Sequence, residues 1–226
     1  MNRPALFMAA IAAAMLLSGP ARGAPPPDTW EGLVKVQSKR LDLAYLQPGA
    51  DFRVYTKVML DPTEVAFAKN WQRDYNSSSS RNLSGRISDR DVQEAIVKGV
   101  SASNEIFAEA WTKGGYAVVD QPGPDVLRIK TGVVNIWVNA PDVPTAGRSH
   151  TFAPEAGSAT FFVEARDSMT GALLGRAVDQ RYAGDAGGNW RTSVSNRGDF
   201  RDLVTNWAND GVRGVNELKS LSPIRQ

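Results

Sequence analysis

The sequence predicts an α+β fold, a two-layer sandwich in which two long helices pack on one face of a mostly antiparallel sheet of about five strands. The first observation is that residues 88–113 and 199–221 carry apolar side chains at three- and four-residue spacing along one side. The second is that shorter segments alternate apolar and polar residues and end at turn-forming residues. The third is size: 226 residues, 42% of them hydrophobic, suffice for one such core.

Residues 1–23 are predicted to be a secretory signal peptide. Arg3 supplies a positive charge, and residues 5–17 are all apolar, a run shorter than the roughly 20 residues that a membrane-spanning helix needs. Ala21 and Gly23 are the small residues that a cleavage site requires. We therefore expect an exported protein, periplasmic or secreted. The alternative interpretation is a buried N-terminal helix.

The rest of the chain divides into an extended leader with a short docked segment, 24–51, and a single α+β domain, 52–226. Three consecutive prolines near the start of the leader favour an extended backbone. The first strand is expected at 52–60. Its inward-facing residues would be Phe52, Val54 and Val58.

The longest helix is expected to begin at Ser88, which can cap the first turn, and to end at Gly114-Gly115. Strands follow at 116–120 and 126–138, with a bulge or bend at Gly132, where the inward-facing positions change parity. A single buried stripe is predicted along the helix, formed by Val92, Ala95, Ile96, Val100, Ser103, Ile106, Phe107, Ala110 and Trp111.

A hairpin is predicted from 158–167 to 172–182, and the second long helix would end at Ser222-Pro223. If the strands at 126–138, 158–167 and 172–182 are antiparallel neighbours, the first and third run the same way. The long loops 139–157 and 183–198 would then leave the sheet at the same end.

Composition and charge exclude several classes of function. There are 26 Lys and Arg against 24 Asp and Glu, and the signal peptide itself carries Arg3 and Arg22, so no basic patch for nucleic acid is expected. The absence of cysteine excludes disulfides, thiolate metal sites and anchoring through a lipidated cysteine. We therefore expect no metal, no cofactor, no nucleic-acid partner and no transmembrane segment after signal removal.

The pattern of polar residues does not predict catalysis. A Ser-His-Asp arrangement would need His150, the single histidine, but the sequence has neither a Gly-x-Ser-x-Gly elbow nor a Ser-x-x-Lys pair. The segment 185–189 lacks the spaced acids of a calcium loop. Asp89, Asp91 and Glu94 stand at a helix start, where the helix dipole alone explains acidic residues.

Binding to a protein is the function that the sequence favours. Trp190 and Arg191 are neighbours in a Gly-rich loop, and these residue types are enriched at interface hot spots. His150, in the other long loop, would share their end of the sheet, whereas Trp71 and Tyr75 are expected at the opposite end. We predict that Trp190, Arg191 and His150 contact an envelope protein. The alternative is that Trp190 folds back over the rim of the core.

Several stretches occur together in a recognisable order. They are Tyr55 to Pro62 (YTKVMLDP), Gly115-Tyr116 followed by Pro122 to Arg128, Asp167-Ser168 with Thr170-Gly171, and Trp207-Ala208. Over roughly 30–221 they resemble the bacterial envelope family catalogued as domain of unknown function 3313. The resemblance implies an exported, often lipid-anchored protein without an assigned activity, from which this chain departs by lacking the lipidation cysteine. The same residues also suit turns, strand ends and a helix stripe, so we expect most of them to determine the fold.

The sequence as a whole therefore predicts an exported component of the bacterial cell envelope that acts as a non-enzymatic protein-binding or accessory module. The alternatives are a glycan- or peptidoglycan-binding protein and a weak hydrolase that uses carboxylates.

Overall fold

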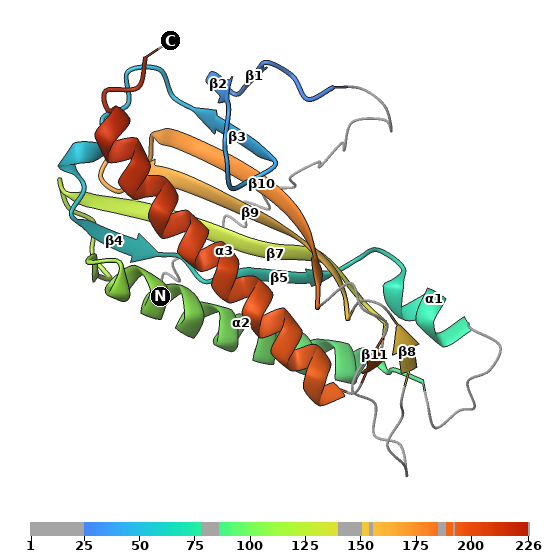
Figure 1. Ribbon diagram of the computed structural model, residues 1–226. Helices are drawn as coiled ribbons and strands as arrows, with labels where there is room; N and C mark the ends of the chain where they lie inside the picture. The colour runs from blue at the N-terminus through green and yellow to red at the C-terminus, as the bar shows by residue number, and fades with distance from the viewer. Residues whose placement is uncertain are drawn as a thin grey trace, which may run out of the picture.

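The computed structural model of the protein describes most of the chain after residue 24 (Figure 1). The residues described are 25–77, 86–139, 151–153, 156–184, 189–191 and 193–225. The predicted signal peptide, with its cleavage residues Ala21 and Gly23, lies outside them. Within these ranges, no helix is both long enough and apolar enough to cross a membrane.

The described strands form one mixed sheet of nine strands and one small ribbon. The order across the sheet is β1-β2-β3-β10-β9-β7-β4-β6, and β5 also pairs with β7. The strands of the sheet are β1 (Thr29–Trp30), β2 (Leu33–Val36), β3 (Leu43–Leu46), β4 (Lys57–Leu60), β5 (Glu64–Phe67), β6 (Ala117–Val118), β7 (Val126–Val138), β9 (Gly157–Asp167) and β10 (Leu173–Ala183). The ribbon pairs β8 (Thr151–Ala153) with β11 (Asn189–Arg191).

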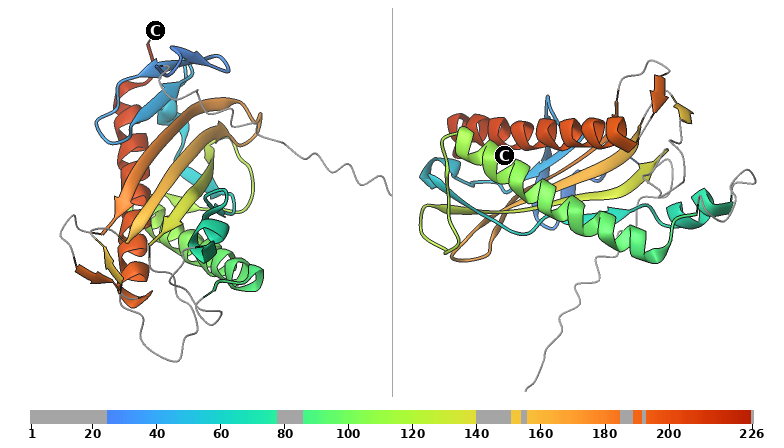
Figure 2. Two further views of the ribbon diagram at one scale, coloured as in Figure 1. Left: turned by 90° about the vertical axis from the view of Figure 1, so that its right-hand side faces the viewer. Right: turned by 90° about the horizontal axis from the view of Figure 1, so that it is seen from below.

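Three α-helices occur in the described part of the chain: α1 (Trp71–Ser77), α2 (Asp89–Lys113) and α3 (Ser193–Leu221). The two long helices, α2 and α3, lie across the same face of the sheet and run in the same general direction (Figure 1). Figure 2 shows that α1 projects from one end of the sheet, beyond the start of α2.

The predicted sandwich of two long helices on about five mostly antiparallel strands is wrong. The sheet has nine strands, and three of its pairings, β4 with β7, β4 with β6 and β5 with β7, are parallel. One reason is that residues 29–46 form β1, β2 and β3, which extend the sheet beyond β10. A second reason is that β4 and the next strand, β5, both pair with β7 and both run parallel to it.

The first predicted strand, 52–60, forms a single 3-10 turn, η1 (Phe52–Val54), followed by β4. The carboxylate of Asp51 caps this turn by accepting a hydrogen bond from a backbone N–H within it, at 3.0 Å. Phe52, Tyr55 and Val58 are all buried, so the apolar side chains recur every three residues. An alternating pattern of inward-facing residues was therefore the wrong interpretation of this segment.

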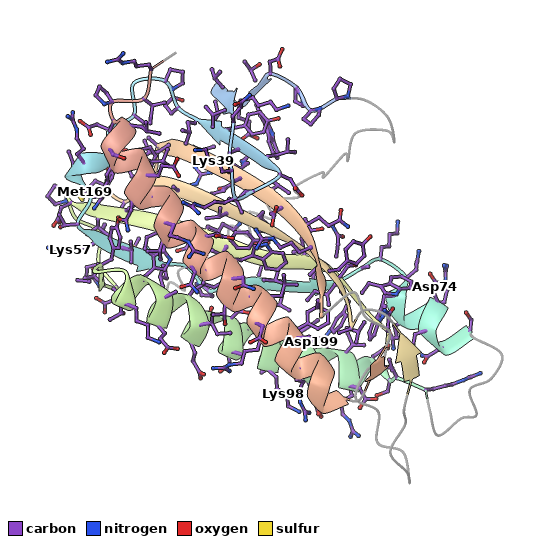
Figure 3. All side chains as sticks on the ribbon, viewed as in Figure 1. Lys39, Lys57, Asp74, Lys98, Met169 and Asp199 are labelled. Carbon is purple, nitrogen blue, oxygen red and sulfur yellow. The ribbon has the colours of Figure 1, made fainter. Side chains whose placement is uncertain are left out.

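The core lies between the sheet and the two long helices (Figure 3). Phe161 of β9 stacks on Phe107 of α2 and on Trp207 of α3, with ring centroids 5.9 and 5.3 Å apart. The indole N–H of Trp207 donates a hydrogen bond of 2.7 Å to the buried carboxylate of Asp179 on β10. These contacts join both helices to the centre of the sheet.

Parts of three of the four stretches that carry the family resemblance meet at one end of the sheet, whereas Trp207-Ala208 lies in the core. The Tyr55 hydroxyl donates to the Asp167 carboxylate at 2.9 Å, and the Thr56 hydroxyl donates to the Asp125 carboxylate at 2.7 Å. The Lys57 ammonium lies 3.2 Å from a carboxylate oxygen of Asp125, and Figure 3 places Lys57 at this end. These side chains bond to one another, as expected of residues that determine a fold.

A buried ion-pair cluster lies on the other face of the sheet. Arg176 donates to one carboxylate oxygen of Glu164 at 2.6 Å, and Arg166 donates to the other at 2.8 Å. Burial opposes ionisation of Glu164, but the hydrogen bonds from these two arginines lower its pKa overall. Trp30 covers the cluster, with its ring 4.2 Å from the guanidinium carbon of Arg176. The cluster therefore joins the N-terminal strands to the sheet.

Candidate functional site

The two long helices are in close contact toward their C-terminal ends. Gly114, directly after α2, lies so close to Val212 of α3 that a Cβ atom would collide with it. The Tyr116 hydroxyl donates to the Asn216 side chain of α3 at 2.8 Å. In this half of α2 the core-facing residues are buried: Ser103, Ile106, Phe107, Ala110 and Trp111.

The first half of α2 is not covered in the same way. Val92, Ile96 and Val100 are only half-buried, and Ala95 is exposed. The prediction of one continuous buried stripe along this helix is therefore wrong for its first half. The apolar pattern continues there, but α3 and the sheet cover it only in part.

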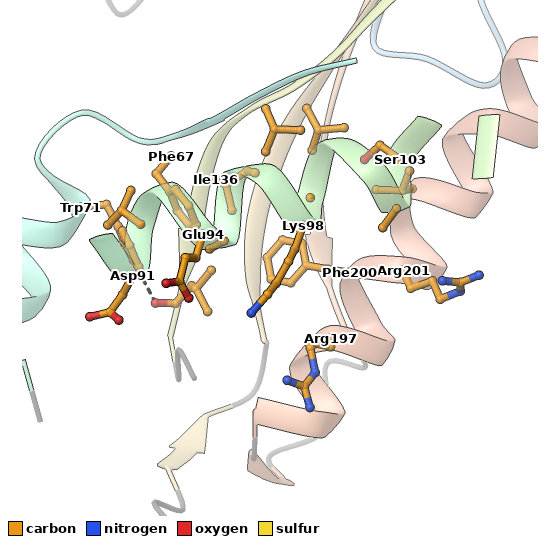
Figure 4. Close-up of a pocket in the computed structure, with 18 of the residues that line it drawn as sticks. Phe67, Trp71, Asp91, Glu94, Lys98, Ser103, Ile136, Arg197, Phe200 and Arg201 are labelled. Carbon is orange, nitrogen blue, oxygen red and sulfur yellow. Dashed lines mark hydrogen bonds between the residues drawn. The ribbon is translucent and has the colours of Figure 1, made fainter. Parts of the chain in front are cut away.

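A groove of about 740 Å³ lies between the N-terminal halves of α2 and α3 (Figure 4). Its floor is formed by Val65 and Phe67 of β5 and by Val133, Ile136 and Val138 of β7. The wall residues from α2 are Asp91, Val92, Glu94, Ala95, Lys98, Gly99, Ala102, Ser103 and Ile106, and those from α3 are Arg197, Gly198, Phe200, Arg201 and Val204. Trp71 and Ile87 complete the lining.

Two local features shape this groove. The first is the set of small residues on its walls, Ala95, Gly99 and Ala102, which leave space where larger side chains would fill it. The second is a register shift in β7 between Val134 and Trp137, which brings Ile136 into the floor. The bulge predicted at Gly132 therefore lies a few residues later, where Asn135 has a φ of 51°.

The charged residues of the groove stand at its exposed rim. Asp91 belongs to the capping box of α2, and hydrogen bonds from Ser88 lower the pKa of its carboxyl. Glu94 lies 3.8 Å from Arg90, one helical turn earlier. Among the residues that the structure describes, the Lys98 ammonium has no ion pair and no hydrogen-bond partner. The acids of the rim thus already have partners on their own helix.

Trp71 closes one end of the groove, and its position differs from the one predicted from the sequence. Its indole N–H donates to the backbone carbonyl of Val138 at 3.0 Å, and its ring stacks on Phe67 at 4.4 Å. Trp71 and Tyr75 were expected at the end of the sheet opposite the loop 139–157, but they lie where that loop begins. The reason is that β5 runs parallel to β7, so both strands finish at the same end.

The predicted partner-binding residues fall on the ribbon or outside the described chain. Trp190 and Arg191 belong to β11, where their backbone positions pair with Phe152 and Thr151 of β8. The two long loops are thus joined by backbone hydrogen bonds. His150 lies outside the described residues. The groove itself was missed, although small residues within the apolar face of 88–113 were a signal for it.

The described residues include no group of three or more acidic or histidine side chains placed to hold a metal ion. The groove, an apolar surface with a charged rim, is the candidate site. Its deep lining offers van der Waals contact to a ligand, and its rim offers ionic contact.

Comparisons with solved structures find chains of related shape at low identity. A PelC dodecamer from Paraburkholderia phytofirmans is 11% identical, with a TM-score of 0.36 over 74% of this chain and 95% of that one. Protein XCC0632 from Xanthomonas campestris, of family DUF330, is 10% identical, with a TM-score of 0.41 over 75% and 90%. Lipoprotein GNA1162 from Neisseria meningitidis is 11% identical, with a TM-score of 0.23 over 68% and 99%. At these values the likeness supports no inference about function.

A search of curated proteins finds no match. The family comparison is decisive, because the family model described as protein of unknown function (DUF3313) matches residues 29–210, most of the chain. This confirms the resemblance drawn from the sequence stretches. The chain belongs to the DUF3313 family.

Proposed function

We propose that this protein is a non-enzymatic binding module of the bacterial cell envelope, and that the groove between α2 and α3 holds the apolar part of its ligand. The observation that carries the proposal is the groove itself, about 740 Å³ in volume and floored by five apolar residues of the sheet. Ligand sites in proteins have volumes of roughly 300–1,000 Å³ and mostly apolar walls.

The state of the rim carboxylates supports binding rather than acid–base catalysis. A general acid or base works best with a pKa near the working pH. The pKa of Asp91 is lowered by its hydrogen bonds with Ser88, away from that range, and the Glu94 carboxylate is near Arg90. Asp91 caps the start of the helix, and Glu94 lies on the exposed side of its second turn. The apolar walls also suit a glycan poorly, because sugar hydroxyls need polar partners.

The position of the ribbon formed by β8 and β11 supports a protein as the larger part of the ligand, beside the apolar group held in the groove. Trp190 and Arg191 lie on β11, which ends two residues before α3 begins at Ser193. A partner that reached the rim formed by α3 would therefore meet this ribbon. We propose that the ribbon positions contact an envelope protein while the groove takes an apolar group. Export is part of this proposal and rests on residues 1–23, whose pattern is that of a signal peptide.

Site-specific photocrosslinking in living cells tests the proposal. A photoreactive phenylalanine analogue would replace Ala95, which is exposed and lines the groove, and in a second variant Ser101, which is exposed on the same helix outside the groove. We expect a specific adduct with an envelope molecule from position 95 and none from position 101. Equal adducts at both positions, or none at either, would contradict the proposed function.

The ribbon is tested in the same cells. Replacing Trp190 and Arg191 together with Ala should reduce any protein adduct formed at position 95, while the thermal unfolding of the purified protein stays unchanged. A protein adduct that persists undiminished would show that the ribbon is not part of the interface.

A further inference from the structure

The groove has a volume of about 740 Å³, which lies in the range of small-molecule ligand sites. A flexible hydrocarbon chain can fit within such a volume, along the space between the two helices.

The deep lining matches a hydrocarbon chain in polarity. Phe67, Val133, Ile136, Phe200 and Val204 are all apolar and surround the space from the floor and from α3. A chain of methylene groups needs no hydrogen-bond partner, and each methylene removed from water adds favourable free energy. The charged lining residues are confined to the exposed rim.

The rim carries a cationic residue, Lys98 of α2, at the mouth of the groove (Figure 4). Arg197 of α3 lines the opposite wall. The acids nearby are engaged, because Asp91 bonds to Ser88 and Glu94 lies near Arg90. In the described part of the chain the Lys98 ammonium has no ion pair, so an anion at the mouth would supply one.

From these observations we infer that the groove binds a single-chain anionic amphiphile, with its hydrocarbon chain along the floor and its carboxylate or phosphate at Lys98. The inference rests on the proposed function and names the class of its ligand. A free fatty acid and a lysophospholipid share this chemistry.

Competition against a fluorescent fatty acid tests the inference on the purified full chain. The probe is dansyl-labelled undecanoic acid, and the competitors are palmitate, palmitoyl lysophosphatidylglycerol and the neutral lipid monopalmitin, which share a chain length. We expect at least one anionic competitor to displace the probe about tenfold more strongly than monopalmitin, as one charge-assisted hydrogen bond allows. Whichever anionic competitor displaces the probe more strongly shows whether the head group is the carboxylate of a fatty acid or the phosphate of a lysophospholipid.

Three variants distinguish binding of the ligand's hydrocarbon chain from binding of its head group. Lys98→Gln should reduce the advantage of the anionic competitor about tenfold, whereas Lys113→Gln, the same change at the far end of α2, should leave it unchanged. Ala95→Trp should abolish displaceable probe binding, because the indole would occupy the groove. Equal competition by monopalmitin, or an unchanged preference in Lys98→Gln, would overturn the assignment of the head group.

Failure of the inference can be told apart from failure of the proposed function. If no lipid competes but photocrosslinking at position 95 captures an envelope protein, the amphiphile is excluded and the groove is a protein site. If no lipid competes and position 95 gives no specific adduct, both the inference and the proposed function fail.

Discussion

At the scale of single residues, Asp167 shows how one carboxylate can hold together segments that are distant in sequence. One of its oxygens accepts hydrogen bonds from the backbone N–H of Thr170 at 2.7 Å and from the Thr170 hydroxyl at 2.8 Å. The other accepts from Tyr55 at 2.9 Å. The hairpin turn between β9 and β10 is thus fixed to the segment that leads into β4.

The first prediction concerns this carboxylate. Hydrogen bonds from the backbone and hydroxyl of Thr170 and from Tyr55 outweigh its partial desolvation and lower the pKa of Asp167. A lowered folded-state pKa stabilises the fold above the ordinary carboxyl pKa, about 4, and that contribution is lost as the pH falls through the folded-state value. Asp167→Asn should therefore lower the free energy of unfolding by about 1–3 kcal/mol at pH 7, and the difference from the parent protein should shrink toward pH 3.

Urea unfolding at pH 7 and at pH 3 measures both effects. Tyr55→Phe is the matched control, since it removes one hydrogen bond and keeps the carboxylate; it should cost about 1 kcal/mol. A destabilisation of Asp167→Asn that stayed constant with pH would show that the ionised carboxylate is not the stabilising form.

The residue patterns in the sequence predicted which side chains are buried better than they predicted the hydrogen bonds that those side chains form. Trp207 was expected in the apolar stripe of the last helix and is fully buried. Its hydrogen bond with Asp179 could not be foreseen, because it depends on how α3 crosses β10. The bond between Tyr55 and Asp167 joins residues 112 positions apart and has the same origin.

At the scale of elements, α2 consists of two halves that are held differently. Its second half is buried against the sheet and α3, and its first half lines the groove. The first half depends on its own capping box, in which the Ser88 hydroxyl accepts from the Asp91 N–H at 3.2 Å while the Asp91 carboxylate accepts from the Ser88 N–H at 2.8 Å.

The second prediction follows from this asymmetry. Ser88→Ala should lower the free energy of unfolding by about 1 kcal/mol, and the loss should be local. Hydrogen exchange measured by mass spectrometry should become faster over 89–100 and stay unchanged over 106–113. Ser101→Ala, on the exposed side of the same helix, serves as the control. Equal acceleration in both halves would contradict a local role of the capping box.

Elements that depend on local pattern were predictable. The long helices and the hairpin of β9 and β10 occur close to the predicted positions, since their periodicity and turn residues are local signals. Short strands that depend on pairing were only partly predictable. The sequence predicted a strand at 116–120, which contains β6, but it did not predict β5, whose four residues are too few for an alternation to stand out.

At the scale of the whole molecule, the parallel pairing of β5 with β7 decides where the candidate site lies. It brings Phe67 and Trp71 to the end of β7, beside the first half of α2. The predicted, mostly antiparallel sheet did not include this parallel pairing, and Trp71 was predicted at the other end. The groove is formed by four main elements, β5, β7, α2 and α3, and only the small residues on α2 were a signal for it in the sequence.

Titration of the purified protein with the apolar fluorophore N-phenyl-1-naphthylamine tests whether this groove is the binding site. We predict saturable binding of one fluorophore per chain to the parent protein and to Ser101→Trp, and no saturable binding to Ala95→Trp, with all three proteins showing the same thermal unfolding. Saturable binding to a folded Ala95→Trp variant, with the affinity of the parent protein, would contradict the claim.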